Sequence, residues 1–276
     1  MTDFFLQHAV NGVWYGIFKH LEENGLKHGI STRLGGVSQA PYRSLNLGIG
    51  TKDAKEAIWR NRELFCEALG LDATQAVTTY QVHGDKVHVV TAADAGQKGV
   101  FPHTVLPDTD ALITNVPGIP LMLFFADCVP IIIYDPVKKA VGVCHAGWKG
   151  TMANIAAKTL GMMQKEYGTN PCDCLAAVAP SIGPCCYEVD QVVIDSLIKS
   201  FPAEIEPPTF AAMVTPKNEK WLLNLWEVNR IKLTESGILA KNIAVSSVCT
   251  ACNTPLFFSH RAENGTTGRF GVVACL

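Results

Sequence analysis

The sequence LMLFFADCVPIIIYDPVKKAVGVCHAGWKGT occupies residues 121–151 and contains strongly strand-like runs. LMLFFA (121–126) and VPIIIY (129–134) are rich in branched and aromatic side chains, and AVGVC (140–144) is a further apolar run. The segment DPVKK between the last two runs is turn-like, with Pro136 near its start. This pattern predicts a buried β-hairpin.

The register of the hairpin decides whether Cys128 and His145 lie on one face. A loop of two or four residues pairs Tyr134 with Val141. The same register places Pro130 opposite His145, and Cys128 then points to the same side as Pro130. Diagonal neighbours across an antiparallel pair lie roughly 7–8 Å apart, so Cys128 and His145 can share a site. An odd loop length reverses the parity, and on spacing alone a buried thiol with a hydrogen-bonded histidine is the favoured interpretation.

The segment after His145 indicates a strand, a turn and a helix. Ala146-Gly147-Trp148-Lys149-Gly150-Thr151 interrupts the strand with two glycines, and the following residues predict a helix over 151–167. Its expected apolar side carries Ile155, Leu160 and Met163. The unpaired N–H groups at such a helix start can bind an anion. The glycine spacing matches neither the Walker nor the dinucleotide fingerprint.

Composition narrows the class of protein. The chain has 276 residues, 23 Lys and Arg against 25 Asp and Glu, and a formal net charge of −2. This balance argues against a nucleic-acid or membrane-surface role, which normally shows a basic stripe. A hydrophobic content of 48% with 17% charged residues predicts a compact protein, and an apolar homodimer contact is compatible with it. No apolar run reaches the roughly 18 residues that span a bilayer. The N-terminus shows no signal peptide, so we expect a cytoplasmic protein.

The ten cysteines are interpreted as reduced thiols rather than as a disulfide framework. Cys249 and Cys252 form a lone CxxC, without a second pair at zinc-finger spacing. The pairs Cys172/Cys174 and Cys185/Cys186 are weak signals. We expect these thiols to serve packing, with a structural metal site or a redox role as the alternative for the Cys249/Cys252 pair.

The rest of the chain predicts a single α+β domain over 1–276, with mixed β-sheets and flanking helices rather than a doubly wound parallel sheet. Aromatic edge strands are expected in 1–30, a long Gly, Ser and Pro-rich loop over 29–50, two short strands over 77–91 and a strand over 110–118. Further helices are expected over 53–70, 190–201 and 221–237, a surface excursion over 202–216, a strand over 242–250, and two strands around a polar loop over 256–276. His103 falls in a polar loop over 92–109.

Several segments together closely resemble the YfiH-type laccase-domain family, the so-called multicopper polyphenol oxidases. They are HGISTRLGGVS (28–38), YQVHG (80–84), TDALIT (109–114), ADCVPIIIYDP (126–136), VGVCHAGWKGT (141–151), AVAPSIGPCCYEV (177–189), LNLWEVNR (223–230) and FFSHRAENGTTGRF (257–270). The resemblance implies mixed sheets flanked by helices. It also implies that His83, Cys128 and His145 hold a metal ion. Three protein ligands are typical of a catalytic zinc (Zn2+) site, although a His2Cys set also suits copper (Cu2+).

The resemblance further implies purine nucleoside phosphorolysis. Phosphate would displace the base of adenosine, inosine or 5′-methylthioadenosine to leave a sugar 1-phosphate, and adenosine deamination is the second implied activity. Asp127, next to a ligand, is the candidate proton carrier or an orienting group. Arg33, Lys149 and Arg261 are the candidate phosphate-binding cations.

Two other functions suit the same residues. A metal-free hydrolase would use Cys128 as nucleophile and His145 as base, which leaves His83 without a role. Copper-dependent phenol oxidation is the other alternative, but a single three-ligand site cannot supply the several coppers that four-electron oxygen reduction needs. A module that binds purines or a metal without turnover would represent a third class.

Overall fold

The computed structural model describes residues 3–96, 105–201 and 204–276, and its largest sheet is built around the predicted hairpin. β7 (Val129–Asp135) pairs antiparallel with β8 (Ala140–Ala146), with Tyr134 opposite Val141 and Pro130 opposite His145. The connecting loop therefore spans residues 136–139, an even number. The predicted register is confirmed, and Cys128 and His145 lie on the same side.

Six strands form this sheet, in the order β13 (Ile243–Val245), β9 (Leu175–Val178), β7, β8, β5 (Ala111–Thr114) and β4 (Val87–Val89). The inner pairs are antiparallel, whereas β13 pairs parallel with β9 and β4 pairs parallel with β5. The predicted mixed-sheet α+β class is therefore confirmed.

A second sheet has five strands, in the order β1 (Phe4–His8), β2 (Trp14–Phe18), β3 (Lys27–Ser31), β14 (Phe270–Cys275) and β6 (Leu121–Phe125). All of its pairs are antiparallel. The N-terminal aromatic segment supplies the edge strand β1, as predicted, but β2 lies inside the sheet between β1 and β3. A short helix α1 (Lys19–Glu23) follows β2. The C-terminal strand β14 joins them to β6.

The two large sheets pack face to face through alternate residues of their strands. Leu123 and Phe125 of β6 belong to one buried cluster with Ile132 of β7 and Val143 of β8. The intervening Phe124 instead packs on the outer face, against helix α2 (Lys55–Ala68). Burying each large apolar side chain contributes roughly 1.5–3 kcal/mol, so the strands are fixed in this orientation.

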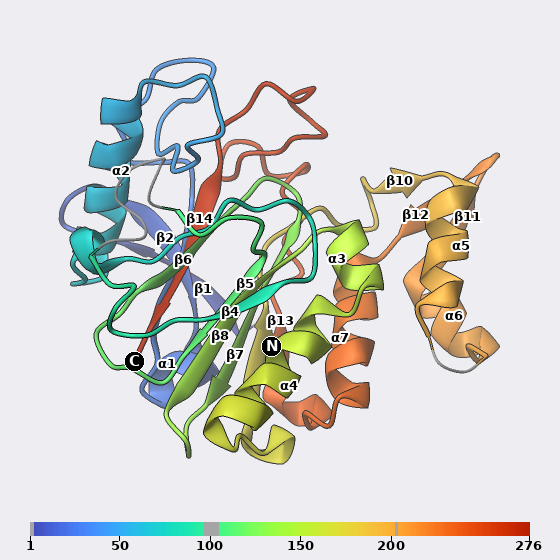
Figure 1. Cartoon of the computed structure of the whole chain (residues 1–276). Helices are drawn as coiled ribbons and strands as arrows, with labels where there is room; N and C mark the ends of the chain where they lie inside the picture. The colour runs from blue at the N-terminus through green and yellow to red at the C-terminus, as the bar shows by residue number, and fades with distance from the viewer. Residues whose placement is uncertain (1–2, 97–104, 202–203) are drawn as a thin grey trace.

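Helices cover the outer face of the six-stranded sheet. Figure 1 shows α3 (Trp148–Met152), α4 (Ile155–Tyr167) and α7 (Leu225–Glu235) together on that side. Leu160 and Met163 of α4 are buried in one cluster with Ile131 and Cys144 of the sheet. Within the described residues no helix is both long enough and apolar enough to cross a membrane.

A smaller unit lies to one side in Figure 1. It contains a three-stranded sheet in the order β10 (Glu188–Val189), β12 (Lys220–Leu223) and β11 (Val214–Lys217), with α5 (Gln191–Lys199) and α6 (Pro207–Met213). The predicted surface excursion over 202–216 is mostly exposed where the structure describes it, and residues 207–217 form α6 and β11. The predicted helix over 221–237 begins only at Leu225, since Asn224 caps it by accepting from the Glu227 N–H.

Three other predicted elements differ from the structure. The helix predicted over 151–167 is two helices, α3 and α4, because Asn154 takes a left-handed conformation between them (φ 60°). Of the two strands predicted over 77–91 only β4 forms, and residues 77 and 79 make isolated bridges instead. Residues 256–258 form no strand; Phe257 and Phe258 are buried from a loop.

Two polar side chains of α2, Asn61 and Arg62, hold the long loop over 29–50 in place by hydrogen bonds. The Asn61 amide donates to Ser38 Oγ and to the Asn46 carbonyl, and its oxygen accepts from the Val37 N–H. Arg62, fully inside, donates to the Leu47 carbonyl. The helix predicted over 53–70 is confirmed, but it buries these two polar side chains as well as Leu64 and Phe65.

Candidate metal centre and active-site cavity

Three segments bring His83, Cys128 and His145 together. His83 lies in the turn before β4, Cys128 in the connection between β6 and β7, and His145 near the end of β8. One ligand atom of each residue lies within 4.8 Å of the others. The rings of His83 and His145 meet edge to face with their centroids 4.8 Å apart. The structure therefore gathers the three predicted residues at one point.

A buried carboxylate, Asp110, organises two of these residues. His145 Nδ1 donates to Asp110 Oδ1 at 2.8 Å, which leaves Nε2 as the nitrogen available to a metal ion. The backbone N–H of His83 donates to the same oxygen at 3.0 Å. The N–H groups of Val82 and Gly84 donate to Oδ2. His83 has a left-handed backbone conformation (φ 62°), which this set of bonds holds in place.

Gly147 leaves the space that the cluster needs. A Cβ atom at this position would lie 3.0 Å from His83 Cδ2 and 3.1 Å from Cys128 Sγ. Its φ of −62° is open to any residue, so the glycine is required by the close approach and not by the backbone. The glycine after the predicted ligand His145 is thus part of the site.

The charges of the cluster favour metal binding. Burial alone would raise the pKa of Cys128, but His145 and His83 beside the sulfur lower it to about 6. Burial alone would lower the pKa of His145, but the Cys128 sulfur and Asp110 raise it to about 9. Without a metal, the pair is therefore a thiolate beside an imidazolium. A divalent cation at this point would replace the imidazolium proton.

The donor set fits zinc. One thiolate and two imidazole nitrogens in contact with a cavity match a three-ligand zinc site that keeps its fourth position for a reactant. A structural zinc site would need a fourth protein ligand there, and the described residues place none within the cluster. The same donors could hold copper.

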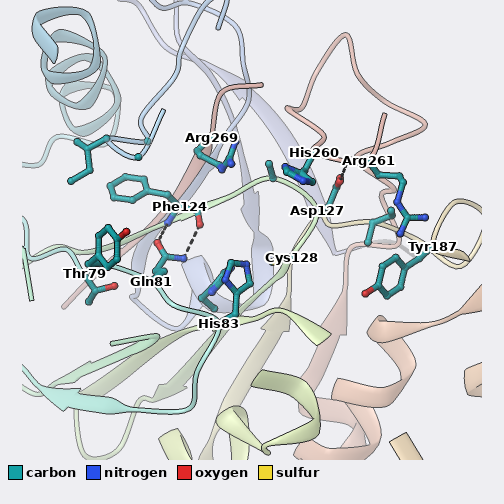
Figure 2. A pocket seen from close by; sticks show the side chains of 17 residues that line it. Thr79, Gln81, His83, Phe124, Asp127, Cys128, Tyr187, His260, Arg261 and Arg269 are labelled. Carbon is teal, nitrogen blue, oxygen red and sulfur yellow. Dashed lines mark hydrogen bonds between the residues drawn. The ribbon is translucent and has the colours of Figure 1, made fainter. Parts of the chain in front are cut away.

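The cluster opens on a cavity of about 440 Å³, a size typical of small-ligand sites. Its walls come from the loop over 29–50, the turn around His83, the β6–β7 connection and the C-terminal loop (Figure 2). The lining residues are Gly48, Ile49, Gly50, Thr79, Tyr80, Gln81, His83, Phe124, Ala126, Asp127, Cys128, His145, Ile182, Tyr187, His260, Arg261 and Arg269.

Asp127 lines the cavity, but both of its carboxylate oxygens are engaged. Oδ1 accepts from Thr250 Oγ1 at 2.7 Å, and Oδ2 accepts from the Arg261 N–H at 2.6 Å. Its backbone is left-handed (φ 82°), and its carbonyl accepts from the Ile182 N–H. These bonds fix the residue that precedes Cys128 in the chain.

The predicted cations differ in position. Arg261 lines the cavity, whereas Arg33 and Lys149 do not. Arg33 Nη1 lies 3.0 Å from Glu263 Oε1, and the guanidinium also donates to the Thr254 and Arg43 carbonyls. Its charge is therefore neutralised within the protein. Lys149 is exposed, and its ammonium lies over the ring of its neighbour Trp148.

Arg269 is a cavity cation that the sequence did not single out. Its guanidinium donates to the carbonyls of Thr267 and Gly268, and like that of Arg261 it makes no ion pair within the described residues. Its sequence signal was available, since Arg269 lies in the segment FFSHRAENGTTGRF together with Arg261. His260 lies beside Arg261 in the same loop and also lines the cavity.

A mixed α+β fold with this His/Cys/His cluster at its cavity is that of a laccase-domain protein. Residues 27–276 match the sequence profile of the multi-copper polyphenol oxidoreductase laccase family, and the chain belongs to this family. The family predicted from the sequence motifs is thus confirmed.

The chain is also similar to named relatives and to solved structures over most of its length. The chain is 40% identical over 241 residues, 87% of this chain and 85% of the relative, to purine nucleoside phosphorylase YlmD of Bacillus subtilis. Human purine nucleoside phosphorylase LACC1 is 32% identical over 84% of this chain and 51% of that protein. The crystal structure of YlmD from Geobacillus stearothermophilus has a TM-score of 0.91 at 36% identity and covers 98% of both chains. That of Bacillus licheniformis YfiH has a TM-score of 0.90 at 38% identity.

Proposed function

We propose that this chain is a zinc-dependent purine nucleoside phosphorylase. It would transfer the ribosyl group of adenosine, inosine or 5′-methylthioadenosine to phosphate, releasing the free base and a sugar 1-phosphate. Relatives such as those from Bacillus subtilis and Bacteroides thetaiotaomicron carry the name purine nucleoside phosphorylase. The observation that carries the proposal is that one cavity combines the His83, Cys128 and His145 donors with two guanidinium groups, of Arg261 and Arg269, that form no ion pair with the acidic residues the structure describes.

Arg261 and Arg269 are the proposed phosphate-binding groups. A guanidinium that donates only to carbonyls keeps its full positive charge for an anion, and its planar fork suits phosphate oxygens. Arg33 is bound to Glu263 and Lys149 points to solvent outside the cavity, so we do not carry them forward as phosphate ligands. In Figure 2, Arg269 and His260 lie across the cavity from His83, which leaves room for a substrate between the cations and the donor cluster.

The purine would lie among the aromatic and polar groups of the wall. Phe124 and Tyr187 both present rings to the cavity, and flat apolar surfaces of this kind bind heteroaromatic bases. Gln81 cannot turn toward a ligand without cost, because its amide makes two bonds, at 2.8 and 2.9 Å, to the Phe124 backbone. Thr79 also lines the cavity, and its Oγ1 is buried without a hydrogen-bond partner among the described residues.

A zinc ion held by His83, Cys128 and His145 would supply a positive charge that polarises a reactant at the cavity floor. The protein's own part is to hold that position. Asp110 keeps His145 Nδ1 protonated and turns Nε2 toward the ion. Since both oxygens of Asp127 accept internal bonds, we assign it an orienting role for Cys128 and the Arg261 backbone in preference to proton transfer.

Adenosine deamination is proposed as a second activity of the same site. The observation that supports it is the three-ligand donor set. A metal ion held by three protein ligands can bind a water molecule in its open position, and purine deamination requires such an activated water. It predicts that inosine forms from adenosine without phosphate.

The test is a product analysis with protein of defined metal content. Zinc-loaded protein is incubated with adenosine, inosine or 5′-methylthioadenosine, with and without phosphate, and the products are separated by chromatography. We expect adenine and ribose 1-phosphate from adenosine only when phosphate is present. Absence of phosphorolysis with all three nucleosides would refute the proposal, and oxygen consumption with a phenol at stoichiometric copper would favour the oxidase alternative.

A variant separates zinc catalysis from the metal-free hydrolase. His83→Ala should lose zinc from the cluster and turnover together, whereas a Cys128–His145 hydrolase would not need His83. Turnover at the wild-type rate in this variant would exclude zinc catalysis.

Four further features remain predictions from the sequence. They are a cytoplasmic location, a homodimer, a single domain over 1–276 and the lack of nucleic-acid or membrane partners.

A further inference from the structure

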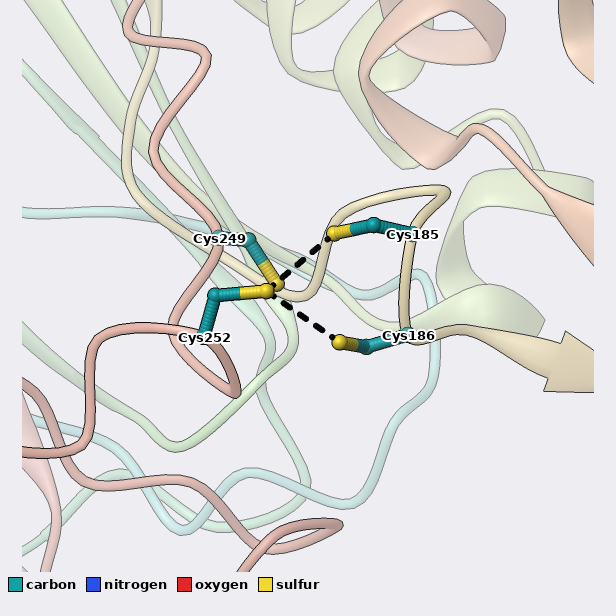
Figure 3. Close-up of side chains that lie close together, drawn as sticks. All are labelled: Cys185, Cys186, Cys249 and Cys252. Carbon is teal, nitrogen blue, oxygen red and sulfur yellow. Dashed lines mark hydrogen bonds between the residues drawn. The ribbon is translucent and has the colours of Figure 1, made fainter.

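Two pairs of cysteines far apart in the sequence, Cys185/Cys186 and Cys249/Cys252, meet at a second point of the molecule. The Sγ atoms of Cys185, Cys186, Cys249 and Cys252 lie within 4.8 Å of one another. Cys252 Sγ is 3.4 Å from Cys185 Sγ and 3.3 Å from Cys186 Sγ. Figure 3 shows the four side chains converging from two loops. The sequence-based prediction that these thiols only serve packing does not explain this convergence.

The backbone holds the two loops in register. Ser181 and Cys249 form a parallel bridge, the Ser181 N–H donates to the Val248 carbonyl, and the Thr250 N–H donates to the Ser181 carbonyl. The Gly183 N–H donates to Cys249 Sγ at 3.2 Å. An N–H donor of this kind stabilises the negative charge of a thiolate. The positions of the sulfurs are therefore set by the fold and not by the side chains alone.

Packing is a poor explanation for these residues. Cys185 and Cys252 are exposed, so their thiols gain little from burial, and only Cys249 is buried. By contrast, Cys66, Cys144, Cys174 and Cys275 are buried, in keeping with the packing role predicted for thiols of this kind. A cluster of four sulfurs at the protein surface is typical of a metal site.

The geometry fits a tetrahedral zinc ion. A Zn–S bond of about 2.3 Å places neighbouring sulfurs of a regular tetrahedron roughly 3.8 Å apart. The two sulfur pairs at 3.3 and 3.4 Å need to separate by only a few tenths of an ångström to reach this value. Four protein ligands make a closed, structural site, in contrast to the three-ligand cluster at the cavity.

We propose that Cys185, Cys186, Cys249 and Cys252 bind a second zinc ion, which fixes one wall of the cavity. Tyr187, a lining residue, directly follows Cys186 in the chain. Thr250, which directly follows Cys249, holds Asp127 through its hydroxyl. Arg261 Nη1 lies 3.4 Å from the Cys186 carbonyl and 3.1 Å from that of Glu188. An ion that joins the two loops would therefore fix Thr250 and the Cys186 carbonyl that Arg261 contacts. Thr250 and the Arg261 N–H bind the two carboxylate oxygens of Asp127.

The test counts zinc ions in the intact protein by native mass spectrometry after exposure to a competing chelator. The wild type should retain two zinc ions per chain. Cys185→Ser/Cys252→Ser, which changes only exposed residues, should retain one. Cys172→Ser, a change of an exposed cysteine outside the cluster, should retain two. His83→Ala should also retain one, because it affects only the cavity cluster.

A spectroscopic measurement on the unmutated chain protects the test from folding artefacts. Cobalt-substituted wild-type protein should show the charge-transfer absorption of a tetrahedral tetrathiolate site, and Cys185→Ser/Cys252→Ser should lose it. Retention of two ions by that double variant would overturn the proposal, and so would a wild type that holds only one ion, with none left in His83→Ala. A disulfide between these cysteines in protein purified under reducing conditions would also overturn it. None of these outcomes depends on turnover, so they are distinct from failure of the proposed phosphorylase activity.

Discussion

Asp110 Oδ1 accepts a hydrogen bond from His145 Nδ1 at 2.8 Å and, at 3.0 Å, one from the backbone N–H of His83. A single oxygen atom thus fixes the ring of one proposed metal ligand and the main chain of another. The second oxygen binds the N–H groups on either side of His83. Asp110 is fully buried, so this arrangement has no solvent to compete with it.

Asp110→Asn should weaken metal binding while leaving all three ligands in place. The neutral amide deprives His145 of its anionic partner. Its nitrogen cannot accept, so either His145 and the His83 N–H or the N–H groups of Val82 and Gly84 also lose their acceptor. Loss of such a supporting group typically lowers metal affinity by about 10–100-fold. Competition with a chromogenic chelator measures the affinity.

Asp85→Asn is the matched control, because Asp85 follows His83 by two residues in the chain but pairs with the exposed Lys158, outside the cluster. Its zinc affinity should equal that of the wild type. Equal affinity in Asp110→Asn would show that the carboxylate does not support the site. Circular dichroism at the assay temperature separates this result from unfolding.

The hairpin was predictable because its information is local. Continuous apolar runs define two strands, and four residues lie between Asp135 and Ala140, an even number, so the face shared by Cys128 and His145 follows. His83 had no such signal, since its neighbours 77–82 form no strand and only tertiary contacts bring it to the site. The family motifs supplied what spacing could not.

Other features depend on contacts between distant segments and could not be predicted locally. Residues 221–223 fit a helical pattern, but they pair with β10 and β11, and the helix begins only after Asn224. Asp110 is one of two acids just before an apolar strand, and its partners are the His145 side chain and backbone groups of another loop. The pairs Cys185/Cys186 and Cys249/Cys252 are individually weak motifs that meet because the chain after β9 runs beside the chain after β13.

Cys128 in metal-free protein should react with iodoacetamide as a thiolate well below the pH at which ordinary thiols do. Its pKa is lowered to about 6, and only the deprotonated form is nucleophilic. The rate should therefore rise through about pH 6 and be nearly constant above pH 7. Peptide mass spectrometry follows alkylation at this position, and added zinc should suppress it.

His145→Gln is the variant that tests the cause of this shift. Burial opposes ionisation of Cys128, and the histidines reverse that effect, with His145 the larger contributor. Without it, the rise in alkylation should move to higher pH. Identical pH profiles for the two proteins would exclude His145 as the source of the lowered pKa.

Gly147→Ala should reduce zinc affinity by steric pressure alone. The added methyl group would meet His83 Cδ2 and Cys128 Sγ at 3.0–3.1 Å, so both ligands must shift by a few tenths of an ångström. Forced packing of this kind costs about 1–3 kcal/mol, which corresponds to roughly a 5–150-fold loss of affinity. Gly161→Ala is the control, because nothing lies within 4 Å of a Cβ there. An unchanged zinc affinity in Gly147→Ala would show that the cluster tolerates a side chain at this point.

Arg269→Gln should raise the KM for phosphate in the phosphorolysis assay. Hydrogen bonds to charged groups contribute about 1.5–3 kcal/mol, so the expected increase is roughly 10–150-fold, with a smaller change in the KM for the nucleoside. Arg261→Gln should act in the same direction. Arg33→Gln instead removes the partner of Glu263, so it should lower the melting temperature and leave the KM for phosphate unchanged. Lys149→Gln should alter neither. A phosphate KM that responds to Arg33 but not to Arg269 would move the anion site away from the cavity wall, to the loop over 29–50.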